Sequence, residues 1–342
     1  MRVTLRDIAK ATDLSVTTVS RALNDYDDVS PGTKALIRRV AEEMGYSPNT
    51  LAQRLRKKRT DTIGLILPTF GPRFSDPFFS ELLAGIGNRA AQHGFDLLVS
   101  TRPPGESEME AYRRKVQGRR VDGFVVVRTR GEDSRIDYLR NEGFPFVAYG
   151  RTDSPLDYPF VDGDGHRGML LVVDHLASLG HSRIACITPP PDLMFTQHRL
   201  EGFRDGLREQ GIQPDEALVR TGDLTQRGGY EQASALLDLP DPPTAIAAFN
   251  DLMAFGAMSA AQERGLVVGK DLAVTGFDDT PMAEHSHPPL TTVHQPIYQI
   301  GSMVCEMLIG LTQGKPPEQP HVLLQPTLVV RLSSEAKGGD DH

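Results

Sequence analysis

The stretch from Thr4 to Asn24, TLRDIAKATDLSVTTVSRALN, decides the fold of the N-terminal part of the chain. Its apolar and small residues recur at helical spacing in two short runs, with a break around Asp13. Thr4 can cap the first helix, with Asp7 three residues further on, and Ser15 can cap the second. Two short helices joined so tightly are typical of a helix-turn-helix, a motif whose second helix enters the major groove of DNA.

The second of these helices carries polar residues where a DNA-reading helix needs them. Thr17, Thr18 and Arg21 are polar, and apolar residues occupy the other side. An arginine in this place can donate two hydrogen bonds to one guanine. A third helix is predicted from Ser30-Pro31 to Gly45, with Ser as its cap and Pro at its first position. Three helices then suffice to close a small core.

The charge of the chain is unevenly distributed. The net charge is -8, but residues 1–60 hold 12 Lys and Arg against 7 Asp and Glu, and the remaining residues hold 25 against 38. The basic N-terminal segment is attracted to DNA phosphates, whereas the acidic remainder is repelled by them. This distribution favours DNA binding by the first sixty residues.

Composition excludes several other classes of protein. Nothing approaches the run of about 18 apolar residues that a membrane span needs. The N-terminus carries charges where a signal peptide would be apolar, so we expect a cytoplasmic protein without membrane contact. Cys186 and Cys305, both in apolar segments, provide neither a disulfide framework nor a metal cage. We therefore expect no cofactor and no metal.

After Thr60, apolar strands alternate with helical stretches. The predicted strands are Ile63–Leu67, Asp96–Ser100, Gly123–Val127, Phe146–Tyr149, Ile184–Ile187, Ala245–Phe249 and Leu272–Gly276. This alternation predicts an α/β fold of parallel sheets flanked by helices, which bind ligands beyond the carboxyl ends of the strands. Polar residues follow three of the strands: Arg128, Asn250-Asp251 and Asp278-Asp279. The sequence thus predicts a ligand site there.

Several segments resemble the lactose-repressor (LacI/GalR) family over nearly the whole chain. They are YSPNTLAQRLRKKRT, SDPFFSEL, VDGFVVV, LASLGHSRIA, HRLEGF, AFNDLMAFGAM, VTGFDDTPMA and PPLTTVHQP. The resemblance implies a two-lobed core like that of periplasmic binding proteins behind the helix-turn-helix domain. The implied divisions are a DNA-binding domain 1–46, a hinge helix and linker 47–60, a core 61–332 and a polar tail 333–342, with an N-lobe of about 61–160 and 293–322 and a C-lobe of about 161–292 and 323–332.

The resemblance also implies how DNA is held. In the family a hinge helix folds on the operator and inserts a leucine into the central base step, which matches Leu55 here, while Ala52 faces the partner hinge. An apolar wedge beside basic residues is suited to unstacking bases. Asp13 replaces the usual glycine of the turn, and Asp tolerates a left-handed backbone. The implied DNA contacts are Thr4, Ser15, Val16, Thr17, Thr18, Ser20, Arg21, Asn24, Asn49, Ala52 and Leu55.

Four residues match the positions at which the family contacts its effector: Arg199, Asn250, Asp278 and Gln295. A guanidinium, an amide and a carboxylate suit the vicinal hydroxyls of a sugar. Phe78 and Phe79 either stack on a sugar face or belong to the core. The predicted effector site comprises Asp76, Phe78, Phe79, Arg128, Arg199, Asn250, Asp278 and Gln295. The segments GPRFSDPFF, VVVRTR and PFVAYGR resemble repressors of α-glucoside use.

The predicted function is that of a transcription repressor whose affinity for a palindromic operator is controlled by a small molecule, and the predicted small molecule is a carbohydrate. Arg128, Arg130 and Arg151 would alternatively suit an anionic metabolite, and a global regulator with a phosphorylated protein as corepressor is the rival function. A homodimer is expected, because the final SSEAKGGDDH is too short and polar for a tetramerising helix.

Two other classes of protein are alternatives to a transcription regulator. A sugar-binding protein of the transport type shares the two-lobed core but lacks a helix-turn-helix. An enzyme would need a catalytic constellation, and none is evident. Gly163 to Gly168 fit G-x-G-x-x-G, but no acidic ribose anchor follows at about twenty residues, so we expect no dinucleotide site.

Overall fold

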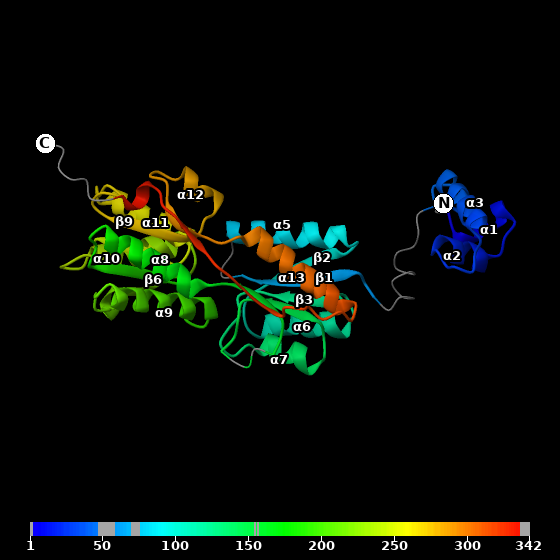
Figure 1. Cartoon of the computed structure of the whole chain (residues 1–342), viewed down its shortest axis with the longest axis horizontal. Helices are drawn as coiled ribbons and strands as arrows, with labels where there is room; N and C mark the ends of the chain where they lie inside the picture. Colours follow the sequence, from blue (N-terminus) through cyan, green and yellow to red (C-terminus); the bar gives the residue numbers. More distant parts are fainter. Residues whose placement is uncertain (1–2, 47–58, 70–75, 154, 156, 336–342) are drawn as a thin grey trace. The chain divides into compact units, whose positions relative to one another are not determined.

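The computed structural model describes residues 3–46, 59–69, 76–153, 155 and 157–335. The chain divides into two compact units, Met1–Arg59 and Thr60–His342 (Figure 1). Each unit has hydrophobic clusters of its own, so each is described separately.

The first unit is a three-helix domain. Its helices are α1 (Leu5–Thr12), α2 (Val16–Leu23) and α3 (Pro31–Glu43). Asp7 Oδ2 accepts a hydrogen bond of 2.8 Å from the backbone N–H of Thr4, and the Ser15 hydroxyl accepts one of 3.0 Å from Thr18 N–H. Asp13 closes the turn in a left-handed conformation, with φ 54°. The predicted helix-turn-helix is thus confirmed. Its core consists of Ile8, Ala9, Val19, Ala22, Val29, Ile37 and Ala41.

The second unit has two lobes, and the first contains a parallel sheet in the order β11-β5-β4-β3-β1-β2. Its strands are β1 (Thr62–Pro68), β2 (Asp96–Arg102), β3 (Gly123–Val126), β4 (Phe146–Tyr149), β5 (Phe160–Gly163) and β11 (His321–Leu324). Its helices are α5 (Pro77–Gln92), α6 (Glu106–Gln117), α7 (Ser134–Asn141) and α13 (Ile297–Thr312).

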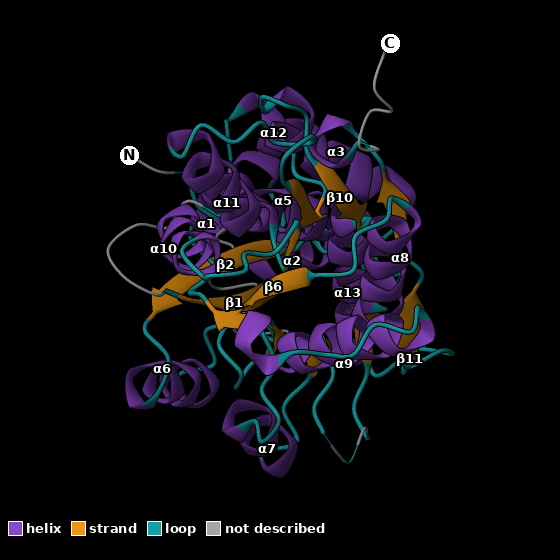
Figure 2. Ribbon diagram, turned by 90° about the vertical axis from the view of Figure 1, so that its left-hand side faces the viewer, coloured by secondary structure: helices purple, strands orange, loops and turns teal. Residues whose placement is uncertain are grey.

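Both faces of this sheet are buried, which explains the continuous apolar run of β1. Ile63 and Leu65 belong to the cluster formed with α5 and α13, whereas Ile66 belongs to the cluster formed with α6 and α7. The two helix pairs accordingly lie on opposite sides of the strands (Figure 1), and α6 and α7 lie below β1 and β2 in Figure 2.

The second lobe contains a sheet in the order β12-β10-β9-β8-β6-β7, parallel except for β12. Its strands are β6 (Ile184–Thr188), β7 (Val219–Thr221), β8 (Ala245–Ala248), β9 (Ala273–Asp278), β10 (Thr291–His294) and β12 (Thr327–Val329). Its helices are α8 (Gly165–Ser178), α9 (Met194–Glu209), α10 (Gln226–Leu237), α11 (Asp251–Glu263) and α12 (Pro281–His285), with short 3₁₀ turns at Glu216–Leu218 and Leu332–Ser334. The α/β fold class with two parallel sheets is confirmed.

The chain crosses between the lobes slightly later than the sequence predicted. The expected crossovers lay near residues 160, 292 and 322, whereas the sheets place them after Gly163, after His294 and between Leu324 and Thr327. The first two crossovers come later because β5 continues through Asp162 to Gly163 and β10 continues to His294, beyond their apolar residues. Asp162 therefore belongs to the first lobe, and Asp278 ends a strand of the second.

The described residues include no helix that is long and apolar enough to cross a membrane. Cys186 and Cys305 are free and buried. Burial raises the pKa of Cys305 to about 12 and the pKa of Cys186 further, so both stay protonated thiols at neutral pH.

Close packing of α5 against α13 generates a stability prediction. A Cβ added to Gly85 would lie 2.2 Å from the carbonyl oxygen of Tyr298, whereas one added to Gly87 would meet nothing nearer than Leu97 Cδ2 at 4.0 Å. Gly85→Ala should therefore lower the free energy of unfolding by about 1–3 kcal/mol, because two helices must separate. Gly87→Ala, the control on the same helix, should raise it by about 0.5–1 kcal/mol. Urea unfolding followed by circular dichroism measures both, and a neutral Gly85→Ala would contradict the close approach.

Candidate functional sites

A cavity of about 710 Å³, part of it open to solvent, lies between the two lobes. It forms where strands of both sheets reach their carboxyl ends, as the sequence predicted for a ligand site. All eight residues of the predicted effector site line it. That they bind a ligand remains a prediction.

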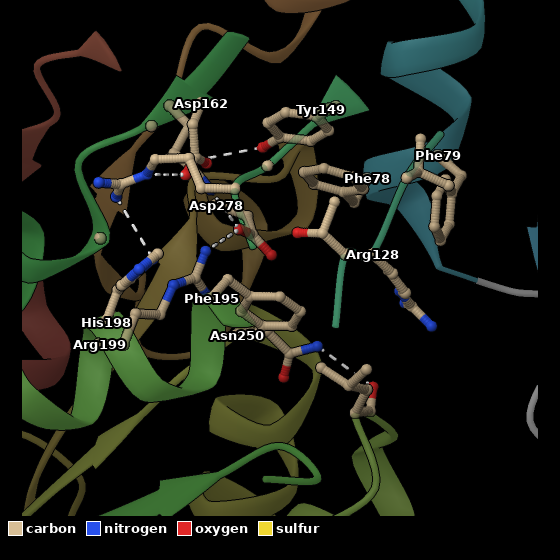
Figure 3. A pocket seen from close by; sticks show the side chains of 18 of the residues that line it. Phe78, Phe79, Arg128, Tyr149, Asp162, Phe195, His198, Arg199, Asn250 and Asp278 are labelled. Atoms are coloured by element: carbon tan, nitrogen blue, oxygen red, sulfur yellow. Dashed lines mark hydrogen bonds and ion pairs between the residues drawn. The ribbon is translucent and has the colours of Figure 1, made fainter. Parts of the chain in front are cut away.

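The charged side chains that line the cavity form ion pairs, of which Figure 3 shows the pair of Arg199 with Asp278. They are Arg128 with Asp76 at 2.8 Å, Arg151 with Asp162 at 2.8 Å and Arg199 with Asp278 at 3.6 Å. Burial raises the pKa of each carboxyl group and is opposed by the arginine beside it. The lining thus holds equal numbers of positive and negative groups.

Arg199 is held by contacts on several sides. Its Nη1 donates to the carbonyl oxygen of Phe249, and its Cζ lies 3.5 Å from the ring centroid of Phe277 and 4.9 Å from that of Phe195. Its Nε is buried and has no hydrogen-bond partner among the residues that the structure describes. A buried N–H without an acceptor costs about 1–3 kcal/mol. An acceptor on a ligand would remove that cost.

Asp278 is fixed by the side chain of Gln295, whose Nε2 donates to Asp278 Oδ1 over 2.8 Å. Gln295 Oε1 in turn lies 3.5 Å from the hydroxyl of Tyr149, which donates from the other lobe. Asp278 has φ 114°, and Arg128 and Leu224 also have positive φ, at 51° and 68°. Strained backbone of this kind clusters at functional sites.

Some residues of the DPFF segment, Asp76–Phe79, face the cavity and others belong to the core. Asp76 caps α5, with Oδ1 accepting from Phe78 N–H over 3.1 Å and Oδ2 accepting from Arg128. Phe79 is fully buried and lies under the Arg128 guanidinium, at 4.8 Å. Of the two alternatives for Phe79, its position fits the core, because the core and the Arg128 guanidinium cover its ring. The half-buried Phe78, stacked on Tyr149 at 5.7 Å, is the aromatic residue of this pair that a ligand can meet.

Asn250 caps a helix in addition to lining the cavity. It caps α11 by accepting from Met253 N–H over 2.9 Å, and its amide donates to the carbonyl oxygen of Leu224 over 3.2 Å. An amide nitrogen carries two hydrogens. One hydrogen therefore remains for a ligand.

Several lining residues are absent from the predicted effector site, among them Tyr149, Asp162, Phe195 and His198. Tyr149 ends β4 and Asp162 lies in β5, so the rule about strand ends would have found both. Phe195 lies one helical turn before Arg199, which places the two on one face of α9. Figure 3 shows Phe195 beside Arg199, and Phe78 beside Tyr149.

The glycines of the G-x-G-x-x-G stretch lack side chains, and this leaves space for neighbouring residues of the cavity. A Cβ on Gly163 would lie 2.4 Å from Gln295 Oε1, one on Gly165 would lie 3.1 Å from Arg199 Cγ, and one on Gly168 would lie 2.7 Å from Phe277. These glycines leave room for the side chains that form the site, which accounts for them without a dinucleotide.

The three arginines of the anionic alternative do not converge. Arg130 does not line the cavity, and it pairs with Glu108 at 2.8 Å. Glu108 also pairs with the fully buried Arg135, which is held by Asp133 as well. Arg130 therefore belongs to a buried network behind the site, and of the three arginines in the anionic alternative only Arg128 and Arg151 line the cavity.

His198 offers a test of the cavity's electrostatics. Burial and the Arg151 guanidinium, whose Nη2 lies 3.3 Å from His198 Nδ1, lower the pKa of His198 to about 4. The imidazole should thus be neutral from pH 6 to 8. Arg151→Leu should raise that pKa toward 6.5, because one repelling charge is lost. Histidine-labelled NMR titration, with His198→Gln to assign the signal, measures it. An unchanged pKa in Arg151→Leu would contradict the contact.

The helix-turn-helix presents part of its predicted DNA-contacting set to solvent. Val16 and Thr17 are exposed at the start of α2, and Arg21 is exposed one turn later. Ser15 caps α2, and the amide of Asn24 donates to the Ser20 carbonyl over 2.6 Å. These positions stay predictions for DNA contact. Asn49, Ala52 and Leu55 lie outside the described residues.

Comparison with known proteins decides the family. The model for bacterial regulatory proteins of the lacI family matches residues 4–49, and that for a periplasmic binding protein-like domain matches residues 173–334. The HTH-type transcriptional regulator AglR of Rhizobium meliloti (strain 1021) is 37% identical over 340 residues, which are 98% of this chain and 95% of that protein. The chain belongs to the lacI family.

Solved structures of lacI-family proteins support the same family assignment. The complex of the transcriptional regulator CelR with cellobiose is 33% identical, with a TM-score of 0.76 over 97% of this chain and 100% of that one. The lac repressor dimer bound to operator and the anti-inducer ONPF is 30% identical, with a TM-score of 0.86 over 98% of this chain and 100% of that one. This lacI-family chain is a DNA-binding transcriptional regulator, as predicted, and not an enzyme.

Proposed function

We propose that this regulator is a homodimeric repressor of a palindromic operator, located in the cytoplasm, and that a neutral sugar, such as an α-glucoside, controls its affinity for DNA. The observation that carries the choice of ligand is the pairing of each arginine in the cavity lining with a carboxylate.

Charge balance favours an uncharged ligand. A phosphorylated sugar brings nearly two negative charges at pH 7, and burying them requires cations that are not already neutralised. The arginines of the lining are paired, and His198, with its pKa of about 4, supplies no positive charge at pH 7. A neutral sugar avoids this cost and can still use guanidinium, amide and carboxylate groups for its hydroxyls.

The aromatic residues of the lining support the same ligand class, because ligand sites are commonly lined by aromatic side chains with a few polar groups. Phe78 comes from the first lobe and Phe195 from the second, so a sugar between them would contact both lobes. CelR, a relative of similar fold, was solved with the neutral disaccharide cellobiose.

A panel of matched sugars tests this choice. Maltose, trehalose and sucrose should be compared with trehalose 6-phosphate and glucose 6-phosphate by thermal shift on the full chain. At least one neutral α-linked disaccharide should raise the melting temperature, because a ligand that binds only the folded state stabilises it. Trehalose 6-phosphate should stabilise the chain less than trehalose does. Stabilisation by the phosphorylated sugars alone would overturn the proposal in favour of the anionic corepressor.

The proposed mechanism couples the cavity to DNA binding. A ligand that touches both lobes favours one arrangement of the lobes over others. Such coupling between ligand and DNA affinity is typically about 1–3 kcal/mol. In a dimer two recognition helices meet two half-sites, which requires a near-palindromic operator. The insertion of Leu55 at its centre remains a prediction about residues that the structure does not describe.

A substitution of Asp278 distinguishes a role in ligand contact from a role in folding. Asp278→Asn should weaken binding of the sugar found in the panel at least tenfold, because a charge-assisted hydrogen bond contributes about 1.5–3 kcal/mol. Operator binding without sugar should be unchanged, and the response to sugar should be lost. Calorimetry and fluorescence anisotropy measure these properties.

The matched control is Asp279→Asn. Asp279 is the next residue, lies outside the lining and pairs with Arg331 at 2.8 Å. The Asp279→Asn protein should keep the wild-type affinity for the sugar. Full sugar affinity in a folded Asp278→Asn protein would refute the assignment of Asp278.

A further inference from the structure

The loop that follows the recognition helix α2 is rigidly built. Asp25 N–H donates to the Ala22 carbonyl over 3.2 Å, Tyr26 N–H donates to the Arg21 carbonyl over 3.1 Å, and Asp25 has φ 63°. This is the hydrogen-bonding pattern of a Schellman closure, which fixes how the chain leaves a helix. Val29, at the other end of the loop, is buried in the domain core.

The same loop is tied to the third helix. The Asp25 carboxylate lies 3.0 Å from Lys34 Nζ and 2.8 Å from Arg38 Nη2. The backbone between Asp25 and Val29 is therefore anchored on both sides. A side chain on this short segment starts from a fixed position, so holding it in one contact costs less conformational entropy than for two free surface chains.

Asp28 projects from this segment onto Arg21. Arg21 Nε donates to Asp28 Oδ1 over 3.1 Å, and Arg21 Nη2 lies 2.6 Å from Asp28 Oδ2. The Tyr26 ring lies beneath the guanidinium, 5.3 Å from its Cζ. The two charged side chains remain 46% and 50% exposed, so the pair adds little to stability. What it does is fix the orientation of the guanidinium.

The geometry leaves the reading edge of Arg21 available. A guanidinium has five N–H groups in a rigid fork. Asp28 occupies the edge formed by Nε and one hydrogen of Nη2, which leaves the edge formed by Nη1 and the second hydrogen of Nη2. Two parallel N–H donors are what the O6 and N7 atoms of guanine accept. Arg21 can therefore be held by Asp28 and read guanine at the same time.

We propose that Asp28 is a positioning residue for base recognition, which holds Arg21 in the orientation that reads guanine. The proposal rests on the proposed DNA contact of Arg21. Simple electrostatics predicts something different, because a carboxylate near DNA repels phosphates and its removal should raise affinity for every sequence alike. Positioning predicts that discrimination between sequences falls when Asp28 is neutralised.

The test uses the full chain and an operator duplex enriched from randomised DNA by the wild-type protein. Anisotropy titrations give the dissociation constants for this duplex, for the duplex with each half-site guanine changed to adenine, and for random-sequence duplex. Asp28→Asn should reduce the guanine-to-adenine discrimination of the wild type by about 3- to 10-fold, with random-sequence binding unchanged or tighter. Retained binding to the random-sequence duplex shows that the domain is folded.

Asp27→Asn is the matched control, because it removes the same charge one residue away and has no ion pair with Arg21 in the described domain. It should keep wild-type discrimination. Arg21→Ala should abolish the discrimination, and the double variant of Arg21→Ala with Asp28→Asn should behave like Arg21→Ala alone, because Asp28 acts through Arg21.

Each outcome bears on one claim. Wild-type discrimination in Asp28→Asn, together with the same uniform gain in affinity as in Asp27→Asn, would show that Asp28 is only a charge and would overturn the proposal. Retained discrimination in Arg21→Ala would instead refute the proposed contact of Arg21 with DNA. A further loss in the double variant would show that Asp28 acts independently of Arg21, which also contradicts positioning.

Discussion

Neutralisation of buried charge is the constraint on which the cavity depends. A carboxylate removed from water needs a cation or hydrogen-bond donors beside it. Asp278, at the end of a strand of the second lobe, meets this need through Arg199 and Gln295. Asp76 and Asp162 meet it through arginines of the first lobe. These pairs keep polar side chains in place around an open volume and leave the volume electrically balanced.

The two-lobed architecture supplies these groups from distant parts of the sequence. The crossovers at Gly163 and after His294 lie close together, since a Cβ on Gly163 would lie 2.4 Å from Gln295 Oε1. Gln295 bonds Asp278 and also lies within 3.5 Å of the Tyr149 hydroxyl, so one crossover residue contacts site residues of both sheets. A ligand in the cavity would therefore act where the lobes are joined.

Much of the fold could be predicted from the sequence because local signals agreed with one another. The caps at Thr4 and Ser15, the left-handed Asp13 and the apolar strands all follow from short-range rules. The roles that depend on pairing could not be predicted in this way. The sequence left Phe79 open between a ligand contact and the core, and only its burial under Arg128 favours the core. The partners of a charged side chain lie far away in the sequence. Only the three-dimensional structure therefore shows which charged groups are paired and which are available to a ligand.

In the proposed mechanism, occupation of the cavity and affinity for DNA are linked through one chain. Thermodynamic reciprocity provides its most direct test. Calorimetry gives the affinity of the wild-type dimer for its sugar with and without saturating operator duplex, and anisotropy gives the affinity for operator with and without saturating sugar. We predict the same factor in both experiments, between about 5- and 150-fold. Sugar affinity that is identical with and without operator would contradict the claim.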